Sequence, residues 1–427
     1  MIEIEKKAEE DNTQTTPTQQ PSRKLKTLIY FIASLSTNGD FIAESFVSLY
    51  AVFIQASAIA LSLITSLKNL FQQVFQFSFG RLSDIFGRKI LMIIGLITAG
   101  ISIALFPLIH NQWVLVAGII FYSIGFASYT PSFAALQGDI TTKKNRAGWL
   151  SLLTIIAAFA TIIGLLIVGF SSDLGSNEYQ QFVIILEIAA GVFISGGIIA
   201  VFIYEPPKEK LTQRQPFSFK PIKENPIFRR LMIINSIMAF TMALGWPIFP
   251  YVRKEFATQK ENSWMWAIFC VFQIIVLIAM RKSINKVRRK PLIVIGRILM
   301  FYIPLNLAIN VIFQLPWWHL AISNALSGAS NALYNVGLKS YILDLAPDNE
   351  RGTYNGQINF FTGISTFLGS LIMGLIADPL IAKFDMWNII TILLFVITGA
   401  RIIAGCTLFL IKEPQEVYVE KTGIITQ

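Results

Sequence analysis

The chain has 427 residues, of which 54% are hydrophobic and 14% are charged, and its formal net charge is +10. Soluble domains carry about 25% charged residues, so this composition argues against a soluble protein. Apolar segments of about 20 residues, the length that crosses a bilayer core, recur along the whole chain. We therefore predict an all-α integral membrane protein rather than a large soluble helical protein.

The apolar segments are separated by short polar loops and predict twelve transmembrane helices. Their ranges are 27–53, 56–79, 90–109, 113–138, 147–170, 180–203, 227–252, 263–280, 291–314, 317–338, 353–377 and 386–411. Glycine and proline occur inside several of them, which membrane helices tolerate better than soluble helices do. Pro247 and Pro250 should break the seventh helix near its outer end, because proline lacks the N–H that a helix needs.

Most of the positive charge falls on one side of these helices. If the N-terminus is cytoplasmic, the inner segments hold 28 Lys and Arg, the outer loops hold 4, and Lys68, Arg297 and Arg401 lie inside spans. This asymmetry places both termini in the cytoplasm and the chain in the cell membrane. The cations therefore set orientation and contact anionic lipid, and they are no evidence for nucleic-acid binding.

The second half of the chain resembles the first. Shifting residues 139–173 by 205 positions onto 344–378 leaves eight identical pairs, and GRKILMIIG at 87–95 resembles RRKPLIVIG at 288–296. FIYEPPKE at 202–209 likewise resembles FLIKEPQE at 409–416. We predict two pseudo-symmetric six-helix bundles, because parallel repeats of this kind occur in secondary transporters. The predicted parts are a disordered tail (1–26), a first bundle (27–204), a cytoplasmic linker (205–226), a second bundle (227–411) and a second tail (412–427).

A charged stretch, GRLSDIFGRK at 80–89, interrupts the apolar sequence between the second and third helices. It resembles the loop motif of the major facilitator superfamily, whose pattern it matches at Gly80, Asp84, Gly87 and Arg88 and leaves at Ile85, where that family has a cation. The resemblance implies a cytoplasmic gate in which Asp84 faces the start of the eleventh helix, near Arg351. A purely topological turn is the competing interpretation, because glycine and headgroup-level cations also suit a tight hairpin.

Two acids lie inside the first helix, within STNGDFIAESFVSLY at 36–50. Asp40 and Glu44 are four residues apart, so they share a helix face, which Thr37 and Ser48 extend. Two close carboxylates in a membrane are not both expected to be charged. We therefore predict that the pair shares one proton and serves as a proton carrier or as a site for a cationic substrate, and the competing interpretation is a structural pair.

In the major facilitator superfamily, helices 1, 4, 7 and 10 line the substrate cavity. The resemblance therefore implies lining positions on three further helices: Tyr122, Tyr129, Asn235, Trp246, Asn324, Asn331 and Asn335. The three asparagines of the tenth helix indicate a polar surface, because unpaired amides in hydrocarbon are costly. An aromatic stripe is more often packing than a ligand contact. Lys68 is expected to face the gate or the bundle interior, and no role is assigned to Arg401.

No nucleotide-binding loop, metal-ligand spacing or hydrolase motif is present, so we expect no enzyme, no cofactor and no metal. The leading prediction is a monomeric secondary transporter that moves a small solute and is coupled to protons through the first helix. Efflux of amphipathic cations is an alternative, although drug–proton antiporters of the family carry an arginine in helix 4 and a Gly-Pro pair in helix 5 that this chain lacks. A membrane sensor built on a transporter scaffold is a third hypothesis, against which the short tails argue.

Overall fold

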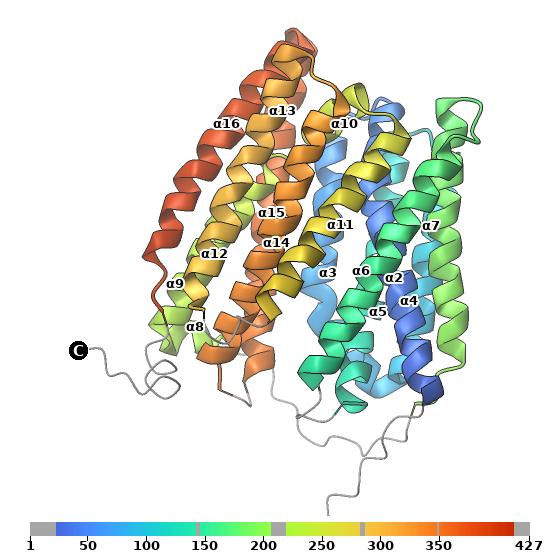
Figure 1. The fold of residues 1–427 in the computed structure, drawn as a ribbon, viewed down its shortest axis with the longest axis vertical. Coiled ribbons are helices and arrows are strands. Elements are labelled where there is room, and N and C mark those ends of the chain that lie inside the picture. Colours follow the sequence, from blue (N-terminus) through green and yellow to red (C-terminus); the bar gives the residue numbers. More distant parts are fainter. Residues whose placement is uncertain (1–22, 142–145, 206–218, 282–286, 348–349, 414–427) are drawn as a thin grey trace, which may run out of the picture.

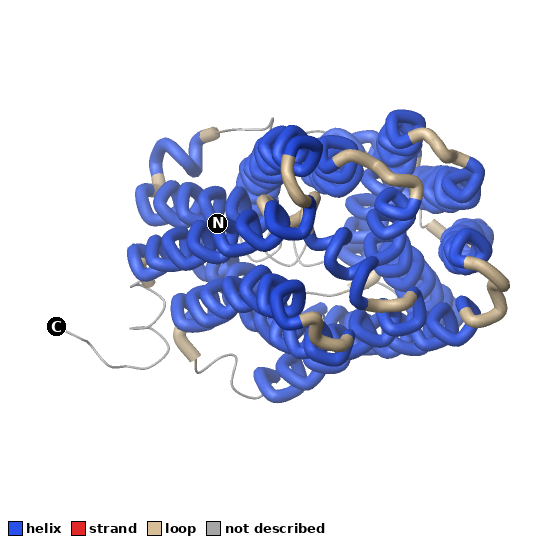
Figure 2. Tube along the Cα trace, turned by 90° about the horizontal axis from the view of Figure 1, so that it is seen from above, coloured by secondary structure: helices blue, strands red, loops and turns tan. Residues whose placement is uncertain are grey.

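A computed structural model describes residues 23–141, 146–205, 219–281, 287–347 and 350–413 of the chain. The described part of the chain consists of helices joined by short loops, and the helices run along one common direction (Figures 1 and 2). The first half of the chain lies on one side of the molecule and the second half on the other (Figure 1). The predicted tails fall almost entirely outside the described residues.

Each of the twelve predicted spans coincides with one helix or with consecutive helices. The first half comprises α2 (Arg23–Phe53), α3 (Ala58–Phe86), α4 (Arg88–Leu105), η1 (Phe106–Leu108), α5 (Gln112–Asp139), α6 (Arg146–Ser172) and α7 (Glu178–Val201). The second half comprises α8 (Lys220–Glu224), α9 (Pro226–Ala243), α10 (Phe249–Phe256), α11 (Gln259–Arg281), α12 (Arg289–Ile298), η2 (Leu299–Phe301), α13 (Tyr302–Phe313), α14 (Trp317–Leu345), α15 (Arg351–Lys383), α16 (Met386–Thr407) and η3 (Leu408–Leu410).

Eight of these helical segments are long and apolar enough to cross a membrane. The predicted spans outside that set are α2, α3, the broken pair α9 and α10, and α14. Helices α2 and α3 carry intramembrane charges, the helix is broken between α9 and α10, and α14 carries the three asparagines. The most polar spans are therefore the ones on which the sequence placed most of the site residues.

The two ends of the molecule are called the linker end and the far end. The linker end holds Arg23, where α2 begins, and Val201, where α7 ends (Figure 1). The far end holds the α2–α3 turn and α10.

The two halves match where helices approach one another closely. Gly164 and its counterpart Gly369 lie against Asn38 of α2 and Phe240 of α9, where an added Cβ would come within 1.9 and 2.3 Å of the nearest atom. Gly169 and Gly374 lie against the opposite half, where a Cβ would come within 3.1 Å of Ser263 and 2.6 Å of Ser62. Identity at these positions therefore reflects close helix contact, which only a residue without a side chain permits.

The other two sequence similarities between the halves, at 87–95/288–296 and 202–209/409–416, contact each other within each half. Glu205 accepts hydrogen bonds from the backbone N–H groups of Arg88 (2.9 Å) and Lys89 (3.0 Å), where α4 begins. Glu413 accepts from the N–H of Lys290 (3.1 Å), where α12 begins. In each half, a carboxylate that follows the last span thus binds the N-terminus of the third span. Unpaired N–H groups and the helix dipole favour an anion there.

The predicted break in the seventh span is present between Ala243 and Phe249. Within it the N–H of Trp246 donates to Ala243, so the carbonyl of Met242 loses its usual helical donor. The carbonyl of Met300 lacks that donor as well, because the residue four positions on is Pro304. Two helices therefore present free carbonyls inside the second half.

Arg401 of α16 binds both of these carbonyls. Its guanidinium donates to the carbonyl oxygens of Met300 and Met242 at 2.8 Å each, and the side chain is almost fully buried. These bonds account for a buried cation to which the sequence analysis assigned no role, since backbone carbonyls at the helix breaks accept hydrogen bonds from it.

Arg401→Met should lower the melting temperature, because each unsatisfied buried carbonyl costs about 1–3 kcal/mol. Pro304→Ala should reduce that loss, since it restores an N–H four residues after Met300. Thermal unfolding of the single and double variants in detergent measures both effects. An equal loss in both backgrounds would show that Met300 does not depend on Arg401.

Candidate functional site

One face of α2 is less covered than the rest of the helix. Between Ser36 and Ala51 every residue is buried except Thr37, Asp40, Phe41, Glu44 and Ser48. The four polar members are those that the sequence analysis placed on one stripe. The stripe faces a more open part of the structure, and Glu44 is its most exposed acid, with 57% of its side chain accessible.

Lys68 of α3 lies between the two acids of this stripe. Its Nζ is 2.8 Å from Oδ1 of Asp40 and 3.1 Å from Oε2 of Glu44, and its side chain is only 9% exposed. With all three groups ionised, the cluster carries one net negative charge. Neither acid therefore has to be protonated to relieve repulsion between them.

The sequence analysis named both acids and placed Lys68 inside a span, facing the gate or the bundle interior, but it did not pair the lysine with the acids. α2 and α3 form a hairpin, Glu44 lies nine residues before the end of α2, and Lys68 lies ten residues after the start of α3. Residues at equal distances from a hairpin turn lie at equal depth, because both helices rise by about 1.5 Å per residue. Counting from the turn would have paired these charges.

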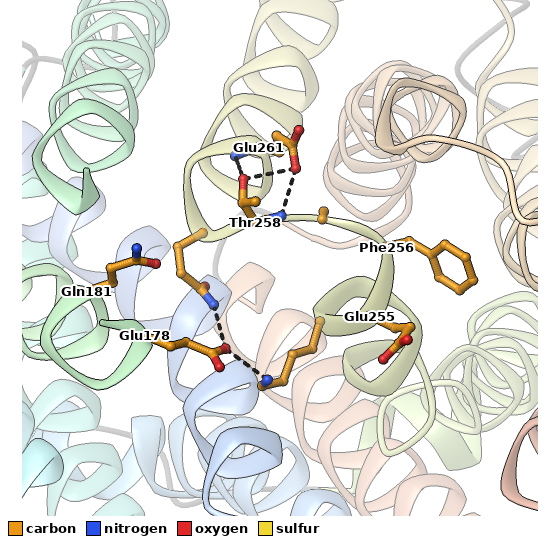
Figure 3. Close-up of a pocket in the computed structure, with 9 residues that line it drawn as sticks. Glu178, Gln181, Glu255, Phe256, Thr258 and Glu261 are labelled. Atoms are coloured by element: carbon orange, nitrogen blue, oxygen red, sulfur yellow. Dashed lines mark hydrogen bonds and ion pairs between the residues drawn. The ribbon is translucent and has the colours of Figure 1, made fainter. Parts of the chain in front are cut away.

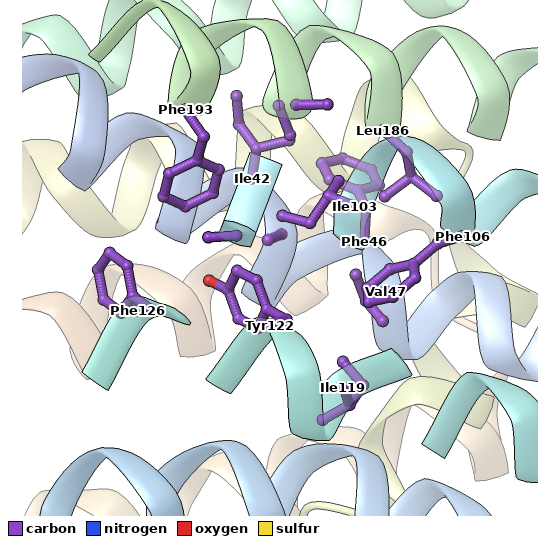
Figure 4. Packing of buried hydrophobic residues seen from close by; sticks show 14 of the residues in the cluster. Ile42, Phe46, Val47, Ile103, Phe106, Ile119, Tyr122, Phe126, Leu186 and Phe193 are labelled. Atoms are coloured by element: carbon purple, nitrogen blue, oxygen red, sulfur yellow. The ribbon is translucent and has the colours of Figure 1, made fainter. Parts of the chain in front are cut away.

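Two tyrosines of α5 hold the acid-bearing helix. Tyr122 donates to Oδ1 of Asp40 at 2.6 Å, and the Tyr129 hydroxyl is hydrogen-bonded to Ser36 at 2.6 Å. Figure 4 shows the Tyr122 ring among apolar side chains that include Phe126 and Ile119, with its hydroxyl as the polar tip. Both tyrosines that the family resemblance placed in the lining therefore contact α2.

The asparagine of α9 belongs to a polar network inside the second half. Asn235 donates to Thr362 of α15 at 2.8 Å and accepts a short hydrogen bond from Tyr334 of α14. The guanidinium of Arg297 lies 3.4 Å from the centre of the Tyr334 ring, a cation–π contact. Asn235 therefore joins three helices of one half.

The asparagines of α14 form two separate groups. Asn324 accepts a hydrogen bond from Arg253 of α10 at 3.3 Å, and Asn335 donates to Asn331 at 2.9 Å. Trp246 lies half-buried in the break between α9 and α10. Only Asn324 is thus tied to a charged side chain that lies near the α2 stripe.

The residues predicted to form a cytoplasmic gate lie at the linker end. Gly87 has a φ of 96°, in the left-handed region that favours glycine, and it separates α3 from α4. Arg88 is buried and donates to the carbonyl of Ala135, while Arg351 begins α15 and donates to Leu343.

Gly80 and Asp84 are the other two residues predicted to form the gate. Gly80 lies near Pro131, and the Asp84 side chain lies outside the described part of the chain. The gate role stays a prediction.

Several polar contacts join the two halves at the far end. Lys260 pairs with Asp173 at 2.5 Å, Lys254 pairs with Glu178 at 2.8 Å, and Asp378 accepts from the N–H of Ala58 at 2.9 Å. Tyr251 of α10 also donates to the carbonyl of Ala56 at 3.0 Å. These bonds hold the far end of the described structure closed.

A polar pocket of about 360 Å³ lies at this junction (Figure 3). Glu178 lines it from the first half, and Lys254, Glu255, Gln259 and Glu261 line it from the second. Glu178 forms an ion pair with Lys254 and accepts a hydrogen bond from Gln259 (Figure 3). The pocket is therefore part of the far-end closure rather than of the α2 stripe.

The sequence of the whole chain identifies its family. The model of the Major Facilitator Superfamily matches residues 28–244 and again residues 231–424. The chain belongs to the Major Facilitator Superfamily. This membership confirms the expected fold and makes the chain a multi-pass membrane protein of a transporter family.

Relatives within the superfamily include proteins named for drug resistance. The chain is 24% identical to "Multidrug resistance protein 1" of Bacillus subtilis and 23% identical to "Quinolone resistance protein NorA" of Staphylococcus aureus, over 70% of this chain and 76% of each relative. It is 24% identical to "Multidrug resistance protein MdtH" of Proteus mirabilis over 49% of this chain. The matched region spans about half of that MdtH (52%) and 29% of an uncharacterized transporter of Mycobacterium tuberculosis.

Solved structures share the fold of this Major Facilitator Superfamily chain. The nucleoside transporter NupG aligns with a TM-score of 0.72 at 11% identity, covering 91% of this chain and 98% of NupG. A bacterial homologue of the lysosomal transporter Spinster aligns with a TM-score of 0.69 at 14% identity, covering 92% and 97%. At these identities the likeness concerns the fold alone.

Lys68→Met should make the protein less stable at neutral pH than at acidic pH. Removing one partner of a buried ion pair costs about 3–5 kcal/mol, because it leaves uncompensated charge. Protonation of Asp40 or Glu44 would remove part of that charge, so stability should recover as the pH falls. The solvent-screened Glu44 should contribute less than Asp40.

Melting temperatures of Lys68→Met across pH, compared with Lys68→Met/Asp40→Asn, test this prediction. The double variant should lose most of the pH dependence. A melting temperature that is independent of Lys68 at neutral pH would contradict the role given to the ion pairs.

Proposed function

We propose that this chain is a secondary transporter that moves a small solute by alternating access and couples it to protons through Asp40, Lys68 and Glu44. The observation that carries the proposal is the position of Lys68 between two acids on the less covered face of α2. Ionisable groups inside a membrane are costly, and they mark ion and substrate pathways in transporters.

The proposed coupling step is a proton transfer to one of the two carboxylates. The new O–H bond neutralises that acid, so Lys68 keeps a full ion pair with only one partner. The cluster then changes from one net negative charge to none, which lowers the cost of moving it through a low-dielectric region. Tyr122 donates to Asp40, so its hydroxyl also responds to the protonation of that acid.

The proposed orientation places the linker end in the cytoplasm. The excess of Lys and Arg in the predicted inner segments supports this orientation. The far end, where ion pairs join the two halves, would then face the outside. Transport would require these far-end bonds to break while the halves rock about the site.

Efflux of amphipathic compounds is the second candidate function. It is supported by the names of the drug-resistance relatives and by aromatic rings beside the stripe. Phe41 of α2 lies edge-on to Trp266 of α11, with ring centres 5.8 Å apart, and is 5.9 Å from Phe269. Flat apolar rings of this kind suit stacking with an aromatic solute. Both acids are already paired with Lys68, so a cationic drug would have to compete with that lysine.

Transport by the purified chain in lipid vesicles tests the proposal. A quinolone and a nucleoside are suitable first solutes, because relatives or fold neighbours are named for them. A pH gradient should drive solute movement, and a trapped pH-sensitive dye should report proton movement with it. Asp40→Asn and Glu44→Gln should each reduce proton-driven transport about tenfold or more, as expected when a coupling group is removed.

Asp173→Asn is the matched control, because it removes an acid that is ion-paired at the far end and lies away from the cluster. It should leave the pH dependence of transport in place. Transport whose pH dependence is the same in all three variants would sink the coupling role of α2.

A further inference from the structure

Arg253 of α10 has hydrogen-bonding capacity that the chain leaves unused. Its Nη2 donates to Asn324 of α14 at 3.3 Å. In the described part of the chain, no carboxylate lies within ion-pair distance of its guanidinium, and its other N–H groups have no acceptor. These groups are open to solvent, whereas the unbonded Nε of Arg401 is buried. Arg253 can therefore donate to a group that the chain does not itself supply.

Three aromatic side chains adjoin Arg253 and contact one another. Its guanidinium carbon lies 4.7 Å from the centre of the Trp266 ring. That ring centre is 5.8 Å from Phe41 and 5.5 Å from Phe269, and the two phenylalanine rings are 5.9 Å apart. Phe41, Trp266 and Phe269 are called the ring group below. A guanidinium stacks through its flat face and donates through its edge, so the contact with Trp266 leaves the unused donors free.

The ring group lies between the two halves and beneath the bonds that close the far end. Phe41 comes from α2 of the first half, whereas Trp266 comes from α11 of the second half. Trp266 and Asn324 each lie seven residues inside the far ends of their helices, which is about 10 Å along the helix axis. Lys260, which pairs with Asp173 at the far end, lies one residue inside α11. A solute at Arg253 would thus be covered from the far end.

The charges beside α2 favour an anion over a cation at this place. Lys68 already pairs with both Asp40 and Glu44, so a cationic solute would have to displace that lysine. An anion would find unused donors at Arg253 and no carboxylate to displace. Arginine binds a carboxylate through two parallel N–H donors, a geometry that few other side chains offer.

The ring group favours an aromatic solute over an aliphatic one. Phe41 and Trp266 are partly exposed, and Phe269 is buried against them. Aromatic rings prefer edge-to-face or offset-stacked contacts, which add to the free energy gained by burial alone. An aromatic ring that carries a carboxylate could therefore contact Phe41 and Trp266 while its charge lies at Arg253.

We propose that Arg253, Asn324 and the ring group form a subsite for a solute that carries a carboxylate next to an aromatic ring. Arg253 binds the carboxylate, Asn324 holds the guanidinium in place, and the solute ring stacks on Phe41 and Trp266. The inference rests on the proposed function and adds the class of solute to it.

Equilibrium dialysis of the purified protein in detergent tests the subsite without requiring transport. The probe is radiolabelled 2-naphthoate, which is ionised at neutral pH. The analogue 2-naphthamide keeps the ring and lacks the charge, and cyclohexanecarboxylate keeps the charge and lacks the aromatic ring. The parent should bind 2-naphthoate about tenfold or more tightly than 2-naphthamide, because the charge-assisted bonds are lost. It should bind 2-naphthoate about threefold or more tightly than cyclohexanecarboxylate, because stacking is lost.

Variants of the subsite separate its two parts. Arg253→Gln should weaken binding of 2-naphthoate about tenfold or more and leave binding of 2-naphthamide unchanged, which shows that the variant is folded. Arg253→Lys should keep part of the affinity, because lysine keeps the charge and loses the planar fork. Phe41→Leu should weaken binding of 2-naphthoate about threefold and leave cyclohexanecarboxylate unaffected. Lys383→Gln is the matched control, because it removes an exposed cation from the last turn of α15 and should change neither affinity.

Equal affinity of the parent for 2-naphthoate and 2-naphthamide would overturn the inference. An Arg253→Gln variant that still prefers 2-naphthoate would do the same, since that is the behaviour of a purely structural arginine. The dialysis result is independent of the vesicle assay. If 2-naphthoate binds through Arg253 but no protons move with solute, the subsite stands and the proposed proton coupling falls. If protons move with another solute and 2-naphthoate does not bind, the proposed function stands and this inference falls.

Discussion

A charge inside a membrane protein needs a partner, and this constraint accounts for the most informative contacts in the structure. Lys68 satisfies it for Asp40 and Glu44 at once, through contacts of 2.8 and 3.1 Å. The α2–α3 hairpin brings the three groups to one depth, and Tyr122 and Tyr129 fix α2 against α5. The ion pairs, the tyrosine contacts and the exposed stripe therefore form one unit.

The same constraint is met differently in the second half. Arg401 binds carbonyls freed by two helix breaks, while Arg297 lies against the Tyr334 ring. The halves share a scaffold, visible in the paired glycines and in the Glu205 and Glu413 caps. They differ in their intramembrane charges: the first half has Asp40, Glu44 and Lys68, and the second has Arg297 and Arg401. The first half therefore carries the paired acids of the candidate site, and the second half carries arginines that lie against backbone carbonyls and an aromatic ring.

Much of the fold follows from the sequence, because apolar length and repeated glycines are local signals. The spans, the break near Pro247 and the turn at Gly87 are where the sequence places them. The site was predicted less completely. Asp40 and Glu44 stand out because acids are rare in spans, whereas the pairing of Lys68 depends on a hairpin depth that periodicity does not reveal.

Contacts between distant parts of the chain were the least predictable. Arg401 binds carbonyls 101 and 159 residues away, and free carbonyls leave no mark in side-chain patterns. Arg253 lies in an outer loop by sequence, but in the structure it contacts Trp266, which lies against Phe41 of α2. Several relatives are named as drug-resistance proteins, whereas the sequence analysis kept drug efflux only as an alternative.

The ionisation state of the two acids tests the central claim most directly. Infrared difference spectroscopy of the reconstituted protein distinguishes a carboxylate from a protonated carboxyl group, and Asp40→Asn and Glu44→Gln assign the bands. If Lys68 holds the cluster, both acids should be carboxylates at neutral pH, and a protonated band should appear on acidification. In Lys68→Met that band should already be present at neutral pH. A protonated band from either acid at neutral pH with Lys68 intact, or bands that do not change in Lys68→Met, would contradict the account.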